Sequence, residues 1–169
     1  MNIEFEQVAI ATRSKDTQSR ILGFLKHMGY EDQAHDRVIA KGTVRAAPSK
    51  LPVENRAHLG FVYGFIPHEF EVLHYVPGEG PHWLASYLPH NGAPIFSHVG
   101  AHVDDVDEAT KTWVSQGFSI VQQVETVSHT NPFLIENGRT FRYAVVGTRQ
   151  LLGFDIKFIQ RLEKPKVEL

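Results

Sequence analysis

Gln7 and His98 stand at the same place in two similar stretches of the chain, 91 residues apart. Residues 5–16 read FEQVAIATRSKD, and residues 96–107 read FSHVGAHVDDVD. Each stretch sets a polar residue in an apolar strand, followed by a turn, an Asp and an amphipathic helix. Gln and His side chains are both plausible metal ligands, so the repeat predicts two ligands in equivalent strands.

The first half of the chain predicts one strand, one helix and three further strands. Residues 3–12 are rich in Val, Ile and Ala, as strands are. Asp16 or Thr17 can cap the helix, and Gly29 ends it. The other strands are expected at residues 35–45, 57–64 and 69–76.

The second half predicts the same order of elements. Its helix begins at Asp107 and ends at Gly117. Its strands are expected at residues 96–103, 118–127, 139–146 and 153–161. Each element thus has a counterpart in the first half, and the fold class is α+β with two tandem βαβββ modules.

These boundaries divide the chain into two modules and two connecting pieces. The first module covers residues 1–78 and the second covers residues 96–161. Residues 79–95 contain several prolines and form a linker with a possible short helix, and the charged residues 162–169 form a tail.

Composition excludes several classes of function. The net charge of the 169-residue chain is −2, which gives no electrostatic reason to expect a nucleic-acid partner. The chain has no cysteine, so disulfides, thiolate metal sites and Cys nucleophiles are excluded. No apolar run is long enough to span a membrane, and the N-terminus has no basic segment typical of a secretory signal. We therefore expect a cytoplasmic protein.

Two tandem βαβββ modules, with Gln or His in the first strand and Glu in the last, resemble the vicinal oxygen chelate superfamily. The resemblance covers roughly residues 3–161 and rests on SHVGAHVDDVDEA at 97–109 and FEVL at 70–73. The superfamily includes glyoxalase I, methylmalonyl-CoA epimerase, extradiol dioxygenases, fosfomycin-modifying enzymes and bleomycin-binding proteins. The resemblance implies a cup-like, half-open β-barrel with a divalent metal ion on its floor.

In that family, the first and last strands of each module supply the metal ligands. Carried over to this chain, the first-strand positions are Gln7 and His98, and the last strand of the first module offers Glu71. The ion implied is Zn, Ni, Co, Mn or Fe. Iron extradiol cleavage is less favoured, because it uses two histidines and Gln7 replaces one of them.

The fourth ligand position is ambiguous. Aligning Phe70 with Ile156 places Lys157 there, whereas aligning Phe70 with Phe154 places Asp155 there. The two candidates are two residues apart and share a face of the strand. Asp155 could bind a metal directly or through water, but a protonated Lys157 cannot ligate and would repel a cation.

Further polar residues are candidates for catalysis or substrate binding. His102 shares a face with His98 and could carry a proton, while Lys157 could act as a base or bind an anion. Arg142, in an alternating strand, could hold a carboxylate or phosphate. His129 lies in a polar loop that could form the lip of a ligand site.

Two functions remain open. One is a metal-dependent isomerase, epimerase or glyoxalase-type lyase, in which the ion chelates two oxygens of a small substrate and Glu71 or a histidine moves a proton. The alternative is a metal-free protein of the same fold that binds or sequesters a small molecule, as Lys157 suggests. Either way we expect a small-molecule ligand, no nucleic-acid or membrane partner, and a possible homodimer.

Overall fold

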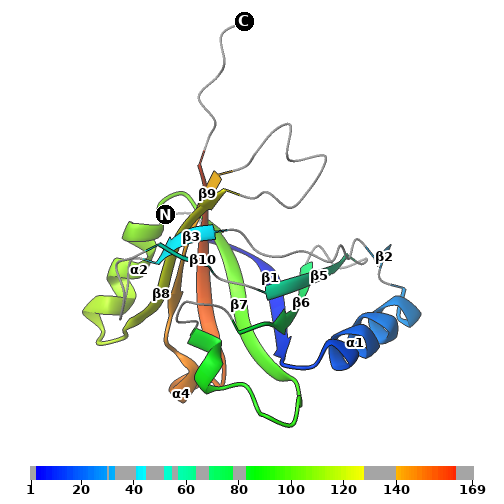
Figure 1. Cartoon of the computed structure of the whole chain (residues 1–169). Coiled ribbons are helices and arrows are strands. Elements are labelled where there is room, and N and C mark those ends of the chain that lie inside the picture. The colour runs from blue at the N-terminus through cyan, green and yellow to red at the C-terminus, as the bar shows by residue number, and fades with distance from the viewer. Residues whose placement is uncertain are drawn as a thin grey trace, which may run out of the picture.

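Strands β1 (Ile3–Thr12) and β7 (Ile95–Val103) lie side by side at the centre of a ten-stranded sheet (Figure 1). The computed structural model describes residues 3–29, 31–32, 41–44, 52–54, 57–63, 69–77, 83–127 and 140–162. The sheet order is β2-β5-β6-β1-β7-β10-β9-β8-β3-β4, so the sheet is open at β2 and β4.

The remaining elements follow the chain in order. The strands are β2 (Glu31–Asp32), β3 (Lys41–Val44), β4 (Pro52–Glu54), β5 (Ala57–Tyr63), β6 (Glu69–Tyr75), β8 (Ile120–Val127), β9 (Thr140–Val146) and β10 (Asp155–Leu162). The helices are α1 (Lys15–His27), the 3-10 helix η1 (Trp83–Ser86), α2 (Val106–Ser115) and the short α4 (Arg149–Leu152).

A pseudo-two-fold axis passes between β1 and β7. The two strands are antiparallel, and Val8 pairs with Val99, its own equivalent in the repeat. On either side, Gln7 pairs with Gly100 and Ala9 pairs with His98, so the axis exchanges these pairs. The repeat seen in the sequence is therefore the symmetry of the sheet.

Outward from the axis the two halves build the same order of strands. On one side β6 runs parallel to β1 and is followed by β5 and β2. On the other side β10 runs parallel to β7 and is followed by β9 and β8. This confirms the predicted α+β class with two tandem βαβββ modules and a half-open sheet.

The hairpin of β3 and β4 departs from the prediction. The sequence predicts residues 35–45 as the second strand of the first module, but β2 takes that edge beside β5. Strand β3 instead pairs with β8 of the second half, and β4 pairs with β3. Local alternation reports that a segment is extended and carries no information about its distant partner.

The N-caps of both long helices lie two or more residues before the positions at which the sequence predicts the helices to start, and they are again 91 residues apart. Ser14 caps α1 by accepting a hydrogen bond from the Thr17 N–H at 3.1 Å. Asp105 caps α2 by accepting from the N–H groups of Asp107 and Glu108 at 2.8 and 3.1 Å. The cap must be the last extended residue, which both Ser14 and Asp105 are.

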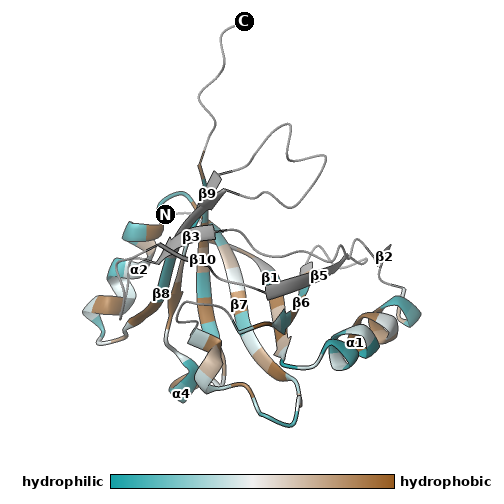
Figure 2. Cartoon of the chain, in the orientation of Figure 1, coloured by the Kyte–Doolittle hydropathy of each residue, from teal (hydrophilic) through white to brown (hydrophobic). Residues whose placement is uncertain are grey.

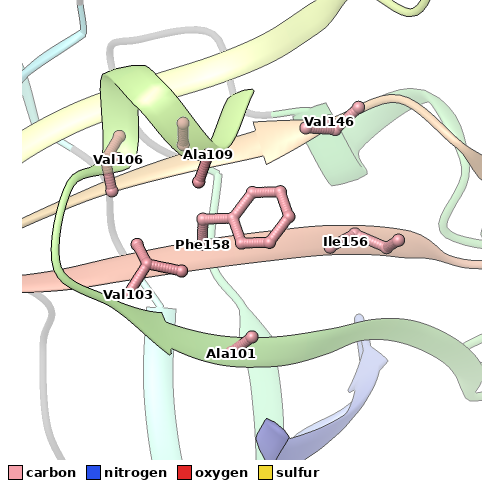
Figure 3. Close-up of a cluster of buried hydrophobic side chains, with 8 residues drawn as sticks. Ala101, Val103, Val106, Ala109, Val146, Ile156 and Phe158 are labelled. Atoms are coloured by element: carbon pink, nitrogen blue, oxygen red, sulfur yellow. The ribbon is translucent and has the colours of Figure 1, made fainter. Parts of the chain in front are cut away.

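The two helices cover the outer face of the sheet. Val106 and Ala109 of α2 pack on the Phe158 ring of β10, as Figure 3 shows. Leu25 of α1 packs against Val72 of β6 in the other half. Figure 2 shows polar and apolar bands alternating along β7 and β10, so the opposite, inner face receives different residues.

The inner face is partly filled by the segment that joins the halves. Leu84 and Leu88 pack on Ala9, Leu73 and other apolar residues of β1 and β6. The guanidinium of Arg13 donates hydrogen bonds to the carbonyls of Ala85 and Leu88, at 2.5 and 3.1 Å.

Among the described residues, no helix is long and apolar enough to cross a membrane.

Candidate functional site

Four polar side chains from the four central strands meet on the inner face. Gln7 lies on β1, Glu71 on β6, His98 on β7 and Lys157 on β10. The Nε2 atom of His98 is 3.1 Å from Gln7 Oε1 and 3.1 Å from Glu71 Oε2. Lys157 Nζ lies 3.5 Å from the same two oxygens. We call these four residues the central quartet.

Strand register settles which residue of β10 is equivalent to Glu71. Glu71 pairs with Ala9 across β6 and β1, and Lys157 pairs with Gly100 across β10 and β7. The pseudo-two-fold exchanges Ala9 and Gly100, so it also exchanges Glu71 and Lys157. Lys157 therefore occupies the fourth position of the quartet.

Gly100 provides the room that Gln7 needs. A Cβ atom at Gly100 would lie 2.7 Å from Gln7 Oε1 and 2.8 Å from Gln7 Cβ, closer than real Cβ contacts come. At the equivalent position in the first half, Ala9 faces His98 across the strand pair. The missing Cβ at Gly100 therefore lets the Gln7 side chain turn toward the quartet.

Gln7, Glu71 and His98 are buried, Lys157 is half-buried, and the charges of the quartet are balanced. Burial acts to raise the pKa of Glu71, but Lys157 and His98 outweigh it and lower that pKa from 4.5 to about 2. Burial and the charge of Lys157 lower the pKa of His98 below its ordinary value, although Glu71 opposes this. At neutral pH, Glu71 is therefore an anion paired with the Lys157 ammonium, and His98 is neutral.

The oxygens of Gln7 and Glu71 set the tautomer of the neutral His98, and Ser97 complements it. The Ser97 hydroxyl lies 3.0 Å from Nδ1 of His98, and both residues are fully buried. A neutral imidazole accepts at one nitrogen and donates at the other. Because Nε2 faces two acceptor oxygens, it carries the proton, and Nδ1 accepts from Ser97.

Two aromatic side chains lie against the quartet. Tyr143 lies beside Lys157, and Trp83 lies beside His98 with 5.9 Å between their ring centroids. The Lys157 ammonium is 5.0 Å from the ring centroid of Tyr143, close enough for a cation–π contact. Burial, followed by the charge of Glu71, raises the pKa of Tyr143, so its hydroxyl keeps its proton. Gln122 Nε2 lies 3.4 Å from that hydroxyl, and Gln122 Oε1 accepts from the Trp83 backbone at 3.1 Å.

The chain is similar in fold to several solved structures. A hypothetical protein from Bacillus halodurans aligns with a TM-score of 0.57 and 13% identity over 98% of this chain and 99% of that one. Methylmalonyl-CoA epimerase from Mycobacterium tuberculosis aligns with a TM-score of 0.54 and 15% identity over 97% and 90%. A methylmalonyl-CoA epimerase in complex with methylmalonyl-CoA and NH4+ aligns at 0.56 and 13% over 98% and 100%.

The chain has the vicinal oxygen chelate fold. No family model and no curated protein matches the sequence itself. Identities of 13–15% show the shared fold, and the chemistry has to be argued from the site.

Within this vicinal oxygen chelate fold, Asp155, the other candidate for the fourth ligand position, lies outside the quartet. It forms an ion pair with Arg149. Its carboxylate accepts hydrogen bonds from the Arg149 backbone N–H and side chain, at 3.1 and 3.2 Å. Arg149 also donates to the carbonyls of Phe96 and Ser97. This pair thus ties α4 to the start of β7, while Lys157 occupies the quartet.

The other predicted residues lie away from the quartet. His102 is on the same strand as His98, four residues along, and contacts Arg161 at 3.2 Å. Arg142 lies beside Tyr143 in β9 but points to the outer face, where it forms an ion pair with Asp107 at 2.8 Å. His129 lies outside the described residues.

Sequence reasoning overlooked several residues that shape the site. Tyr143 is the neighbour of Arg142 in an alternating strand, so strand parity alone placed one of the two on the inner face. Ser97 stands beside His98, and a buried hydroxyl next to a buried histidine is a natural hydrogen-bond partner. Gln122 and Trp83 come from distant segments, and no local pattern links them to the site.

A divalent ion does not fit the quartet while Lys157 keeps its place and proton. An ion about 2.1 Å from the Gln7 and Glu71 oxygens would lie within about 6 Å of the ammonium, and at an effective dielectric of ~20 their repulsion is about 6 kcal/mol. Three ligands would remain, namely Gln7, Glu71 and His98. Among the described residues, no group of three or more His, Cys, Asp or Glu side chains could hold a metal.

Proposed function

We propose that this protein is an isomerase- or epimerase-type enzyme that acts on a small molecule bearing a carbonyl or carboxylate oxygen. The observation that carries the proposal is the central quartet, which places a buried carboxylate and a half-buried ammonium 3.5 Å apart on the inner face. Support comes from the methylmalonyl-CoA epimerases that share the fold over nearly the whole chain. Their reaction moves a proton beside a thioester carbonyl.

In this proposal, Lys157 stabilises the negative charge that develops on the substrate oxygen. Its side chain is 12% exposed, whereas that of Glu71 is 2% exposed, so the ammonium is the part of the ion pair nearer to an entering ligand. A fixed cation in a buried pocket stabilises an enolate-like transition state more strongly than water does.

Glu71 is then the base, and the substrate controls its strength. At rest its pKa of about 2 makes it a weak base, because Lys157 and His98 offset the effect of burial. An anionic substrate oxygen that takes up the charge of Lys157 removes the main offset. Burial then raises the pKa of Glu71 toward the range useful for proton transfer.

Gln7 and His98 hold the carboxylate in place for this step. Neutral His98 donates from Nε2 to Glu71 Oε2, and Gln7 Oε1 accepts from the ammonium of Lys157. Both side chains therefore orient the pair without adding charge. Lyase chemistry, which the family resemblance also implied, remains a prediction for this chain. Metal dependence, the other implication of the resemblance, is untested, and the position of Lys157 argues against it.

The second candidate function is metal-free binding of a small anion. The same ion pair favours it, since a carboxylate can share the Lys157 ammonium with Glu71 without any proton transfer. The two functions differ in one measurable step, the exchange of a substrate C–H proton with solvent.

Proton exchange in D2O tests the proposal. The purified protein is incubated with methylmalonyl-CoA and other small 2-substituted acids or thioesters, and the loss of the α-proton signal is followed by NMR. We expect exchange with at least one compound, and a rate at least about 100-fold lower for Glu71→Gln and Lys157→Met. Lys111→Met, which removes an exposed cation from α2, is the control.

The outcomes separate the two functions. Exchange that depends on Glu71 and Lys157 supports the enzyme. Saturable binding of the same compounds without exchange, lost in Lys157→Met, supports the binding protein. Exchange that Glu71→Gln leaves unchanged contradicts the assignment of Glu71 as the base.

A further inference from the structure

Lys157 stands where the symmetry of the sheet calls for a second Glu71. The pseudo-two-fold axis exchanges Ala9 with Gly100. It therefore also exchanges Glu71, the partner of Ala9 on β6, with Lys157, the partner of Gly100 on β10. A carboxylate at both positions, together with Gln7 and His98, would make a four-ligand set of oxygen and nitrogen donors. This chain instead has a carboxylate in one half and an ammonium in the other.

The ammonium makes the contacts that a bound cation would make. Lys157 Nζ lies 3.5 Å from Gln7 Oε1 and from Glu71 Oε2, the two oxygens that His98 Nε2 also faces. These separations are those of an ion pair rather than of short hydrogen bonds. The Lys157 side chain is only 12% exposed and its ammonium lies 5.0 Å from the centroid of the Tyr143 ring, so solvent screens its attraction to Glu71 only in part.

We propose that Lys157 is a built-in replacement for the divalent ion of this fold, so that the site works with a cation supplied by the protein itself. The ammonium carries one charge and three N–H donors, and two of them face Gln7 and Glu71. The third is available to an oxygen of a carboxylate or of an enolate-forming carbonyl. The ligand class is therefore a small organic anion.

This inference predicts that one substitution restores a metal site. Lys157→Glu removes the repelling charge and adds a carboxylate at the position equivalent to Glu71. Two buried carboxylates beside each other repel, and a divalent ion between them relieves that repulsion. Lys157→Gln removes the charge without adding a carboxylate, so it measures the effect of repulsion alone.

Calorimetric titration with ZnCl2 and with NiCl2 tests the prediction on four proteins: wild type, Lys157→Gln, Lys157→Glu and the double variant Lys157→Glu/His98→Ala. We expect the affinity of Lys157→Glu to exceed that of wild type by at least about 100-fold, with Lys157→Gln between them. The double variant should lose most of this gain, because His98 is one of the ligands.

Two results overturn the inference. One is a wild-type protein that binds zinc or nickel as tightly as Lys157→Glu does, with binding lost on His98→Ala. The other is equally weak binding in wild type, Lys157→Gln and Lys157→Glu, which would mean that residue 157 does not face the ligand set.

Thermal unfolding provides a readout that does not require a well-folded apo variant. Added zinc should raise the melting temperature of Lys157→Glu by several degrees or more and leave that of wild type unchanged. If Lys157→Glu folds only in the presence of zinc, the inference is supported. If zinc raises both melting temperatures equally, it is contradicted.

The inference rests on the geometry of the quartet and is separable from the proposed enzyme activity. In the exchange assay, wild-type activity should be unaffected by EDTA. If no substrate exchanges its proton but the titrations give the expected order, the proposed function fails and the inference stands. If exchange occurs but requires zinc, the inference fails and the epimerase proposal remains.

Discussion

The two halves of the sheet use the same positions for opposite chemistry. The first half supplies two oxygen groups, Gln7 and Glu71, and the second supplies two nitrogen groups, His98 and Lys157. Acceptors on one side of the axis thus face donors on the other. Each half alone would bury uncompensated polar groups, and together they form a neutral, hydrogen-bonded cluster.

The scaffold around the quartet differs much less between the halves. The helix caps Ser14 and Asp105 are equivalent. The same is true of Val8 and Val99, which pair with each other at the axis. The two halves therefore share the elements that fix backbone geometry and differ in the residues at the axis, which are complementary partners. The predictions below test this complementarity, beginning with the change expected to be most damaging.

Removing the acidic partner should destabilise the protein most. Glu71→Ala leaves the Lys157 ammonium buried without its counter-charge and should lower the free energy of unfolding by about 4 kcal/mol, measured by urea denaturation. Glu108→Gln, which neutralises an exposed carboxylate on α2, should change it by less than about 0.5 kcal/mol. The double variant Glu71→Leu/Lys157→Met should recover most of the loss, and a double variant as unstable as Glu71→Ala would show that the charges are not partners.

Acid should weaken the charge interactions between the two halves and so lower the free energy of unfolding. The folded pKa of Glu71, about 2, lies below its unfolded value near 4.5, so its stabilisation is complete above pH 4.5 and is lost as pH falls toward 2. The loss is about 3 kcal/mol at most. His98, whose pKa is also lowered, adds a loss that begins below its unfolded value of 6.5.

Urea denaturation between pH 7 and pH 3 measures these contributions. Wild type should lose stability more steeply than Glu71→Gln below pH 4.5, and more steeply than His98→Ala between pH 6.5 and 4.5. Parallel curves for wild type and both variants would contradict the charge assignment of the quartet.

Restoring a side chain at Gly100 should make the halves more alike and the protein less stable. The Cβ of Gly100→Ala would approach Gln7 Oε1 to 2.7 Å, which should cost about 2 kcal/mol in unfolding free energy. Gly23→Ala on α1 meets no atom within 4 Å and should be neutral or stabilising. Gln7→Gly removes the side-chain atoms that the new Cβ would meet, so Gly100→Ala should cost less in the Gln7→Gly background than in wild type, and an equal cost would place the clash elsewhere.

The smallest effect is expected from Ser97. Ser97→Ala removes the donor to His98 Nδ1 and should lower the unfolding free energy by about 1 kcal/mol. The 15N chemical shift of His98 Nδ1 should then change, because this atom loses its hydrogen-bond donor. Ser115→Ala at the exposed end of α2 is the matched control. An unchanged Nδ1 shift in Ser97→Ala would mean that Ser97 does not donate to His98.

The architecture could be read from the sequence because the duplication preserves spacing. The separation of 91 residues relates Gln7 to His98 and also relates the two helix caps. Glu71 and Lys157 are only 86 residues apart, so the repeat could not choose between Lys157 and Asp155. Pairing of β10 with β7 made that choice, and strand pairing is a long-range property.

Other parts of the site were beyond sequence reasoning for the same physical reason. The placement of β3 beside β8 and of Trp83 beside Gln122 depends on contacts between segments far apart in the chain. Arg142 points to the outer face because its neighbour in β9, Tyr143, takes the inner face. Local alternation predicts that one of two neighbours faces inward, and packing decides which.

The pairing of β3 with β8 also bears on how this polypeptide reaches its native state. Thr43 must find Glu125 after most of the chain between them has been made, and contacts of such wide sequence separation slow folding. Until they meet, β8 presents an open edge that invites aggregation. A chain cut between residues 79 and 95 should therefore yield two fragments that associate, through the pairing of β1 with β7 and of β3 with β8, rather than two independent folding units.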